Sequence, residues 1–241
     1  MVYIIDIQLY TYRYEVWRCC LAAIREKGSS AEPNNLSLKT MFEQIDKFVD
    51  RIISLTPAER QIFHAMLKFK RVRKRTYLLQ EGEICNFEAY ILKGCIRTYY
   101  LSDDGTEVIP SFSIEDTWVS DACSFTAQTP SNLFIESLED CELLVIDYES
   151  KVALYEKIPQ FETLFSMLIQ QSYFALQKRF YSLVSQTAEQ RYLAFVEKYP
   201  QVVQRVPQKQ IARYLGVSPQ FLSKVRSAIH KKKGFSPISG Y

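Results

Sequence analysis

Histidine is scarce in the sequence, and cysteine never occurs at the spacing that binds zinc. The chain has 241 residues but only two histidines, His64 and His230, and none of its six cysteines forms a C-x-x-C pair. Zinc sites and the metal centres of cupin-type enzymes need clustered histidines, cysteines or carboxylates. We therefore expect no enzymatic activity, no bound metal and no cofactor.

Long apolar runs are missing as well. No stretch approaches the ~20 apolar residues of a membrane-spanning helix. Polar residues such as Asp6, Gln8, Arg13 and Glu15 interrupt the N-terminal segment, which is unlike a secretory signal. We expect a cytoplasmic protein without a membrane partner, whose scattered cysteines stay reduced and buried.

Acidic residues are rare near the C-terminus. Residues 187–241 hold ten Lys or Arg and two acids, Glu189 and Glu197, for a net charge of +8. The rest of the chain holds 20 basic and 25 acidic residues, for a net charge of −5. An acidic body with a basic end favours a polyanionic partner, because the attraction is long-ranged and sensitive to salt.

The first 40 residues differ from the rest of the chain. Residues 1–40 are rich in tyrosine and end in the loop-like run GSSAEPNNLS, and we expect them to be a disordered or artefactual extension, with the natural product beginning at Met41. Met41 opens an amphipathic pattern, MFEQIDKFVDRIISL, that predicts a helix. A second helix is predicted after Thr56, which forms a capping-box pattern with Glu59.

Short β-type runs begin at Phe69. Alternating residues such as Ile96, Thr98 and Tyr100 indicate strands with one buried face, and Asp104-Gly105 indicates a hairpin turn. Several short strands with turn signals are typical of a barrel or jelly roll. The basic run KFKRVRKR at residues 68–75 is interpreted as a solvated strand that enters this roll, with a nucleic-acid patch as the alternative.

A long helix is predicted from Phe161 to Ser185. Its apolar residues recur at intervals of three and four, and it carries apolar groups beyond one face, so one face can pack on the β-body and another on a second copy. Burial of the whole stripe within one subunit remains the alternative. The expected dimerisation residues are Leu164, Leu168, Ser172, Leu176, Phe180 and Leu183.

The stretch QKQIARYLGVSPQFLSK, at residues 208–224, has the parts of a helix-turn-helix. Ile211, Ala212 and Leu215 form the inner face of a first helix, and Gly216 can adopt the positive φ of a tight turn. Ser218 is the expected cap of a second helix whose first residue is Pro219. A plain helical hairpin would match the spacing too, but less often with this surplus of positive charge.

The outward residues of the second helix suit a major groove of DNA. Gln220 can pair with adenine, Lys224 with guanine or phosphate, and Phe221 can contact a thymine methyl group. Basic residues of the same region, Lys231 to Lys233 included, are candidate phosphate contacts. The full set of expected DNA-binding residues is Lys209, Arg213, Ser218, Pro219, Gln220, Phe221, Ser223, Lys224 and Arg226.

From about Met41 to Lys233 the chain resembles the Crp/Fnr family of bacterial transcription regulators. The order of a β-roll, a long helix and a helix-turn-helix carries the resemblance, together with the strand-turn rhythm of LLQEGEICNFEAYILKGCIRTYYLSDDGTE. It implies an α+β fold with an N-terminal double-stranded β-helix (jelly-roll-like) sensor domain, a dimerisation helix and a C-terminal winged helix-turn-helix domain. The implied domains are residues 41–155, 156–186 and 187–241.

The resemblance also implies partners. They are double-stranded DNA with a two-fold symmetric operator, a second copy of the chain, and, as candidates, RNA polymerase and a small-molecule effector that the sequence does not identify. A ligand-binding signalling module of the cyclic-nucleotide-binding fold that lacks DNA-binding activity is the alternative.

The sequence departs from the family where cyclic nucleotide would bind. Members that bind it carry a Gly-Glu-Leu-like cassette and an Arg-Ser or Arg-Thr step, whereas residues 118–125 read WVSDACSF and residues 129–134 read TPSNLF. No Lys or Arg occurs between Arg97 and Lys151. A buried phosphate without a cationic partner is costly, so the sensor pocket is predicted to bind cyclic nucleotide weakly or not at all. The tail KKKGFSPISGY is also short for a full wing.

Overall fold

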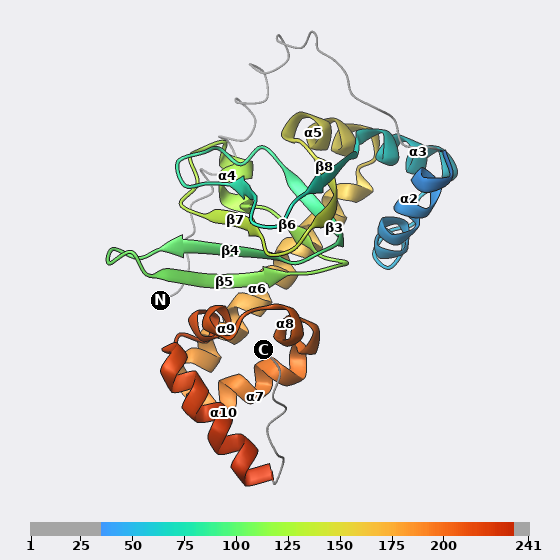
Figure 1. Cartoon of the computed structure of the whole chain (residues 1–241). Helices are drawn as coiled ribbons and strands as arrows, with labels where there is room; N and C mark the ends of the chain where they lie inside the picture. The colour runs from blue at the N-terminus through green and yellow to red at the C-terminus, as the bar shows by residue number, and fades with distance from the viewer. Residues whose placement is uncertain (1–34, 234–241) are drawn as a thin grey trace, which may run out of the picture. The chain divides into compact units, whose positions relative to one another are not determined.

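The computed structural model describes residues 35–233, nearly all of them in one compact unit that begins at Lys39 (Figure 1). The predicted extension thus falls largely outside the described residues, as do Cys19, Cys20 and any wing after Lys233. No helix in the described range is both long and apolar enough to span a bilayer.

The first helix of the described residues begins earlier than the sequence indicated. α2 spans Asn35–Val49, so it starts six residues before Met41. The extra residues include Asn35, Ser37 and Thr40, which are common in loops. Once a helix is nucleated, each added residue gains a backbone hydrogen bond, and α2 therefore continues into a segment whose composition predicted a loop.

Two four-stranded sheets form the predicted roll. Their orders are β1-β8-β3-β6 and β2-β7-β4-β5, and the neighbouring strands pair antiparallel, which is the jelly-roll arrangement. The predicted β-roll is confirmed. The strands are β1 (Lys68–Val72), β2 (Tyr77–Leu79), β3 (Glu88–Lys93), β4 (Ile96–Leu101), β5 (Glu107–Ser113), β6 (Trp118–Val119), β7 (Phe134–Ser137) and β8 (Cys141–Ile146).

Apolar side chains fill the space inside the roll. Ile91, Ile96, Ile135 and Leu143 are fully buried and belong to one packed cluster that also contains Phe125. The predicted hairpin joins β4 to β5, with Gly105 at φ 76°. β1 is largely exposed, and Arg71 on it pairs with Glu142, which agrees with a solvated strand.

Helices pack on the outside of the roll, around a second core. Ile45 of α2, Phe63 of α3 and Phe161 of α6 are fully buried in it, together with Tyr90 of β3. The predicted capping box of Thr56 and Glu59 is present at the start of α3. The remaining helices of this region are α3 (Pro57–Met66), α4 (Ala122–Ala127), α5 (Tyr148–Lys157) and α6 (Gln160–Ser185).

The apolar stripe of α6 does not stay on one side of the helix. Leu164 is fully buried against the chain's own core and Leu168 packs partly against it, whereas Leu176 and Phe180 are 60% and 61% exposed. Residues spaced by four rotate by about 40° per step around a helix, so the predicted seam turns from the roll toward solvent. Leu164 was therefore wrongly included in a seam between two copies.

Four helices follow α6 and share a third core. Ile211, Ala212, Leu215 and Leu222 are at most 4% exposed in it, as the inner face of the predicted motif requires. These helices are α7 (Ala188–Lys198), α8 (Pro200–Arg205), α9 (Gln208–Leu215) and α10 (Pro219–Lys233). Every strand described lies before Tyr148, so residues 148–233 are helical apart from their connections.

Candidate nucleic-acid interface and its contacts with the roll

The turn between α9 and α10 has the predicted geometry. Gly216 ends α9 at φ 69°, and the amide of Val217 donates to the carbonyl oxygen of Ala212 at 3.0 Å. The amide of Phe221 donates to Oγ of Ser218 at 3.1 Å, so Ser218 caps the helix that opens with Pro219. The positive φ at Gly216 and the serine cap are confirmed.

One face of α10 is open to solvent. Gln220, Ser223 and Lys224 are exposed, and Phe221 is 48% exposed although it is a large apolar residue. Lys209 on α9 is exposed as well. The outward positions named from the sequence therefore lie outward, and their contact with DNA remains a prediction.

Arg213 differs from the other predicted contacts. Its guanidinium forms an ion pair with Glu107 of β5, so it is engaged within the chain rather than free for a phosphate. Arg226 is half-buried and its Nε has no hydrogen-bond partner among the described residues. α9 packs against β5, and this contact, which the local pattern does not reveal, is the reason for the difference.

Glu107 extends the pairing into the roll. Arg97 of β4 donates to Glu107 at 2.9 Å and to Glu136 of β7 at 2.6 Å, and Arg97 is only 7% exposed. A chain of alternating charges thus joins α9 to three strands of one sheet. Buried charged groups keep their ionised forms only when such partners are present.

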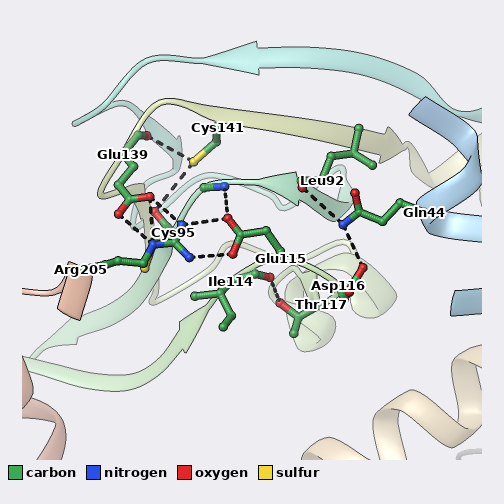
Figure 2. Close-up of polar contacts among 11 residues, drawn as sticks. Gln44, Leu92, Cys95, Ile114, Glu115, Asp116, Thr117, Glu139, Cys141 and Arg205 are labelled. Atoms are coloured by element: carbon green, nitrogen blue, oxygen red, sulfur yellow. Dashed lines mark hydrogen bonds and ion pairs between the residues drawn. The ribbon is translucent and has the colours of Figure 1, made fainter. Parts of the chain in front are cut away.

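Arg205, the last residue of α8, holds two carboxylates of the roll (Figure 2). It donates to Glu115 at 2.6 and 2.9 Å, and to Glu139 at 2.6, 3.0 and 3.2 Å. The planar guanidinium matches carboxylates in this forked geometry, which makes such pairs stronger than ordinary hydrogen bonds. We call Arg205, Glu115 and Glu139 the Arg205 clamp.

Glu115 also accepts a hydrogen bond from the turn between β3 and β4. The amide of Gly94 donates to it at 2.7 Å. Burial alone would raise the pKa of Glu115, but the hydrogen bonds from Arg205 and Gly94 hold this pKa below its usual value. Gly94 has φ 115°, and a Cβ there would lie 2.4 Å from Sγ of Cys141, so this close packing requires glycine.

A third arginine joins α6 to the same region. Arg179 donates to the carbonyl oxygens of Ile109 at 2.9 Å, of Tyr214 at 2.7 Å and of Pro110. Its guanidinium lies 4.1 Å from the ring centre of Tyr214. Burial lowers the pKa of Arg179, and its charge is stabilised by carbonyl dipoles and an aromatic face.

The region that the sequence resemblance assigns to the cyclic-nucleotide cassette contains a buried carboxylate. Asp121 is 8% exposed and caps α4, and its side chain accepts hydrogen bonds from the amides of Cys123 and Ser124 at 3.1 and 3.2 Å. Oγ of Ser131 donates to it at 2.6 Å. The amides that could receive an anion at this helix start are thus already bound to an anion of the chain.

One buried cation lies near this helix. Lys151 of α5 is 7% exposed, and its Nζ lies 2.5 Å from Glu88 and 5.1 Å from the ring centre of Phe125 in α4. The sequence predicted no cation near the cassette, because residues 98–150 contain no Lys or Arg and Lys151 comes directly after them. Both Lys151 and Arg97 have carboxylate partners.

The thiols and histidines are not assembled into a site within the described range. Burial raises the pKa of Cys95 to about 12 and that of Cys141 to about 11, so both thiols stay neutral at physiological pH. Cys85 is also buried, whereas Cys123 is exposed, contrary to the expectation of buried thiols. Cys123 lies in the first turn of α4, where its side chain is exposed.

His64 lies on α3, with Nε2 2.8 Å from Asp46.

Residues 69–157 match the family described as the cyclic nucleotide-binding domain. No curated protein matches the chain in sequence. Several solved structures are similar to the chain in fold.

The regulator CLP of Xanthomonas campestris, described as c-di-GMP-responsive, has a TM-score of 0.63 at 18% identity over 77% of this chain and 96% of its own. FixK2 from Bradyrhizobium japonicum has a TM-score of 0.61 at 18% identity over 73% and 89%. A Crp/Fnr-family protein from Eubacterium rectale has a TM-score of 0.60 at 17% identity over 77% and 88%. The chain has the fold of the Crp/Fnr regulators.

The resemblance stated from the sequence is thereby confirmed. Within this Crp/Fnr fold, the sequence did not single out the residues that tie the last helices to the roll. Arg205 entered the sequence analysis only through the net charge of residues 187–241. No role was predicted for Glu115 or Glu139. Their partners lie 90 and 66 positions away in the sequence, so no local spacing could have revealed them.

Removal of the central charge tests the Arg205 clamp. We predict that Arg205→Met lowers the free energy of unfolding by roughly 1–3 kcal/mol at neutral pH, because two carboxylates lose their partner in a partly screened environment. The pKa of Glu115 is lowered in the folded protein, so the clamp contributes fully above the ordinary value of 4.5 and is lost as the pH falls through the folded pKa. Urea unfolding of both proteins should therefore show a difference that shrinks in acid.

Arg71→Met is the matched control. Arg71 pairs with Glu142 at 3.3 Å, but the two side chains are 76% and 39% exposed. Such a pair contributes at most about 1 kcal/mol. An equal loss in both variants, or a loss that does not depend on pH, would contradict the clamp.

Proposed function

We propose that the chain is a sequence-specific DNA-binding transcription regulator of Crp/Fnr type that acts as a homodimer. The open face of α10 carries this proposal. It follows a glycine turn and a serine cap, it presents polar and basic side chains, and it lies in a segment of net charge +8. Residues 41–155, 156–186 and 187–241 then act as sensor domain, dimerisation helix and DNA-binding domain.

Within this proposal, α10 enters the major groove. Gln220 and Lys224 contact base edges, Phe221 contacts a thymine methyl group, and Lys209 contacts phosphate. Ser218 and Pro219 set the start of the helix, and Ser223 lies on the same exposed face. Arg213 and Arg226 are weaker candidates, since the first is paired with Glu107 and the second is half-buried.

Lys224→Ala tests the reading helix. We expect a loss of roughly 1–3 kcal/mol on the specific operator, found first by genome-wide mapping of bound sites, and a much smaller loss on random duplex DNA. Fluorescence anisotropy with both duplexes at several salt concentrations measures the two affinities. Lys157→Ala is the control. It removes the same charge from an exposed position of α5, outside the helix-turn-helix, and should change the affinity for neither duplex strongly.

Equal losses on both duplexes would assign Lys224 to phosphate contact rather than base contact. Absence of salt-dependent binding to any duplex would instead favour the alternative function, a signalling module of this fold without DNA-binding activity.

The homodimer rests on the exposed part of α6. Ile169, Tyr173, Leu176, Phe180 and Leu183 are between 42% and 61% exposed and recur at intervals of four and three. That spacing places them on one seam of a two-helix contact. This seam replaces the sequence-based one, since Leu164 and Leu168 pack on the roll and the two seams share only Leu176, Phe180 and Leu183.

A charge placed in the seam should separate the two copies. We expect Phe180→Glu to shift the protein from dimer to monomer, because a desolvated carboxylate opposes its own copy across the axis. Size-exclusion chromatography with light scattering gives the mass. Gln171→Glu adds the same charge at an exposed position of α6 outside the seam, and the dimer should persist. Dissociation of both variants would contradict the assigned seam.

We further propose that the roll does not bind cyclic nucleotide. The apolar cluster around Ile91 and Leu143 fills the roll interior, and Asp121 already occupies the amides at the start of α4. A cyclic phosphate would add a second negative charge beside this carboxylate. Arg97 and Lys151 offer no free cation, as both are paired with glutamates.

Isothermal titration with cyclic AMP and cyclic GMP tests this absence. We expect no saturable heat from the roll at micromolar ligand, because the cyclic phosphate of either nucleotide would lack a charge-assisted partner there. A cyclic-nucleotide-binding protein of the same fold, titrated in the same buffer, is the control. Micromolar binding to the roll would contradict the proposal, whereas binding that Arg191→Gln on α7 abolishes would lie outside the roll and would not.

A further inference from the structure

A cavity of about 640 Å³ lies outside the packed interior of the roll. Side chains of strands β4 to β6 line it on one side and side chains of helices α6 to α9 on the other. The volume falls in the range of roughly 300–1,000 Å³ that is typical of small-molecule sites. The cavity shares no lining residue with α10, so it is separate from the proposed DNA face, but Leu176 and Leu183 of the proposed dimer seam lie in its α6 wall.

The lining of the cavity is positively charged. Lys178 and Arg179 of α6 and Arg191 and Lys198 of α7 contribute to it, and no Asp or Glu is among its lining residues, all of which lie in the described range. Arg179 donates to three carbonyl oxygens, and Arg191 donates to the carbonyl oxygen of Gln186 at 2.7 Å. Four positive charges without an acidic lining residue favour an anion inside the cavity.

Two donors of the lining lack partners. Nε1 of Trp118 and Nε of Arg191 are buried and make no hydrogen bond with described residues. Buried donors are almost always satisfied in folded proteins, because leaving one unpaired costs more than an average hydrogen bond contributes. A ligand acceptor in the cavity would satisfy them.

Aromatic side chains form much of the remaining wall. They are Phe112, Trp118, Phe195, Tyr199 and Tyr214. Rings of this kind bury a flat apolar group and favour offset or edge-on contact with another ring. The cations and the free donors therefore suit the anionic group of a ligand, and the aromatic side chains suit a ring of the same ligand.

We infer that this cavity binds a small organic anion that carries an aromatic ring. The anionic group faces Arg191 and Lys198, and the ring lies against the aromatic wall. The site is built from both the roll and the C-terminal helices, and it takes a ligand class that the packed roll interior and the capped start of α4 do not accommodate.

Titration with the fluorescent dye 8-anilinonaphthalene-1-sulfonate tests the inference, since this probe joins an aromatic body to an anionic group. We expect saturable binding of one dye per chain. Arg191→Gln and Lys198→Gln should each weaken it by roughly tenfold, the usual scale for loss of one charge-assisted contact. Lys157→Gln removes an exposed lysine that does not line the cavity and should leave the affinity unchanged. Circular dichroism verifies that each variant is folded.

N-phenyl-1-naphthylamine, which has the same aromatic body without the sulfonate, separates the cavity from exposed apolar surface. We expect it to bind more weakly than the anionic dye and to be insensitive to Arg191→Gln. Equal binding of the two dyes, equal affinity in all three variants, or no saturable binding of the anionic dye would overturn the inference. No DNA is present in this experiment, so its outcome is independent of the proposed DNA binding.

Discussion

The guanidinium of Arg205 is the point on which the C-terminal helices and the roll both depend. It joins the end of α8 to Glu115 after β5 and to Glu139 before β8, and Glu115 in turn holds the amide of Gly94 between β3 and β4. One positive charge thus compensates two carboxylates that would otherwise repel each other in a partly buried place. Without a partner, such carboxylates destabilise a fold by more than the pair stabilises it, so the docked helix end stabilises the conformation of these loops.

Three arginines share the task of attaching the helices to the sheet that contains β5. Arg179, Arg205 and Arg213 each reach that region from a different helix, and their partners are carbonyl oxygens or carboxylates rather than apolar side chains. Polar attachment of this kind is directional, because each guanidinium fork matches only one orientation of its acceptors. The direction in which α9 lies, and with it the start of α10, is therefore tied to the backbone of β5. A change at β5 has a direct route to the proposed DNA-reading helix.

Local patterns predicted the local structure well. The capping box at Thr56, the hairpin at Gly105 and the turn at Gly216 depend on neighbours within a few residues, and each is present. The confirmed β-roll followed from alternation and turn spacing. The ion pair of Arg213 with Glu107 and the Arg205 clamp were not predicted, because the partners are distant in the sequence and meet only in the tertiary fold. The sequence likewise did not show which part of the α6 stripe is buried. In the structure Leu164 packs on the core of its own chain, whereas Leu176 is exposed.

The cap of α4 has a consequence for what the roll can sense. A diffusible ligand reports its own abundance, because the fraction of protein that holds it rises and falls with its concentration. Asp121 is part of the chain, so it stands beside the amides of Cys123 and Ser124 at a high and constant effective concentration. Under the proposal that the roll does not bind cyclic nucleotide, these amides stay bound to Asp121 whatever ligand is present, and a variable input would reach the molecule elsewhere.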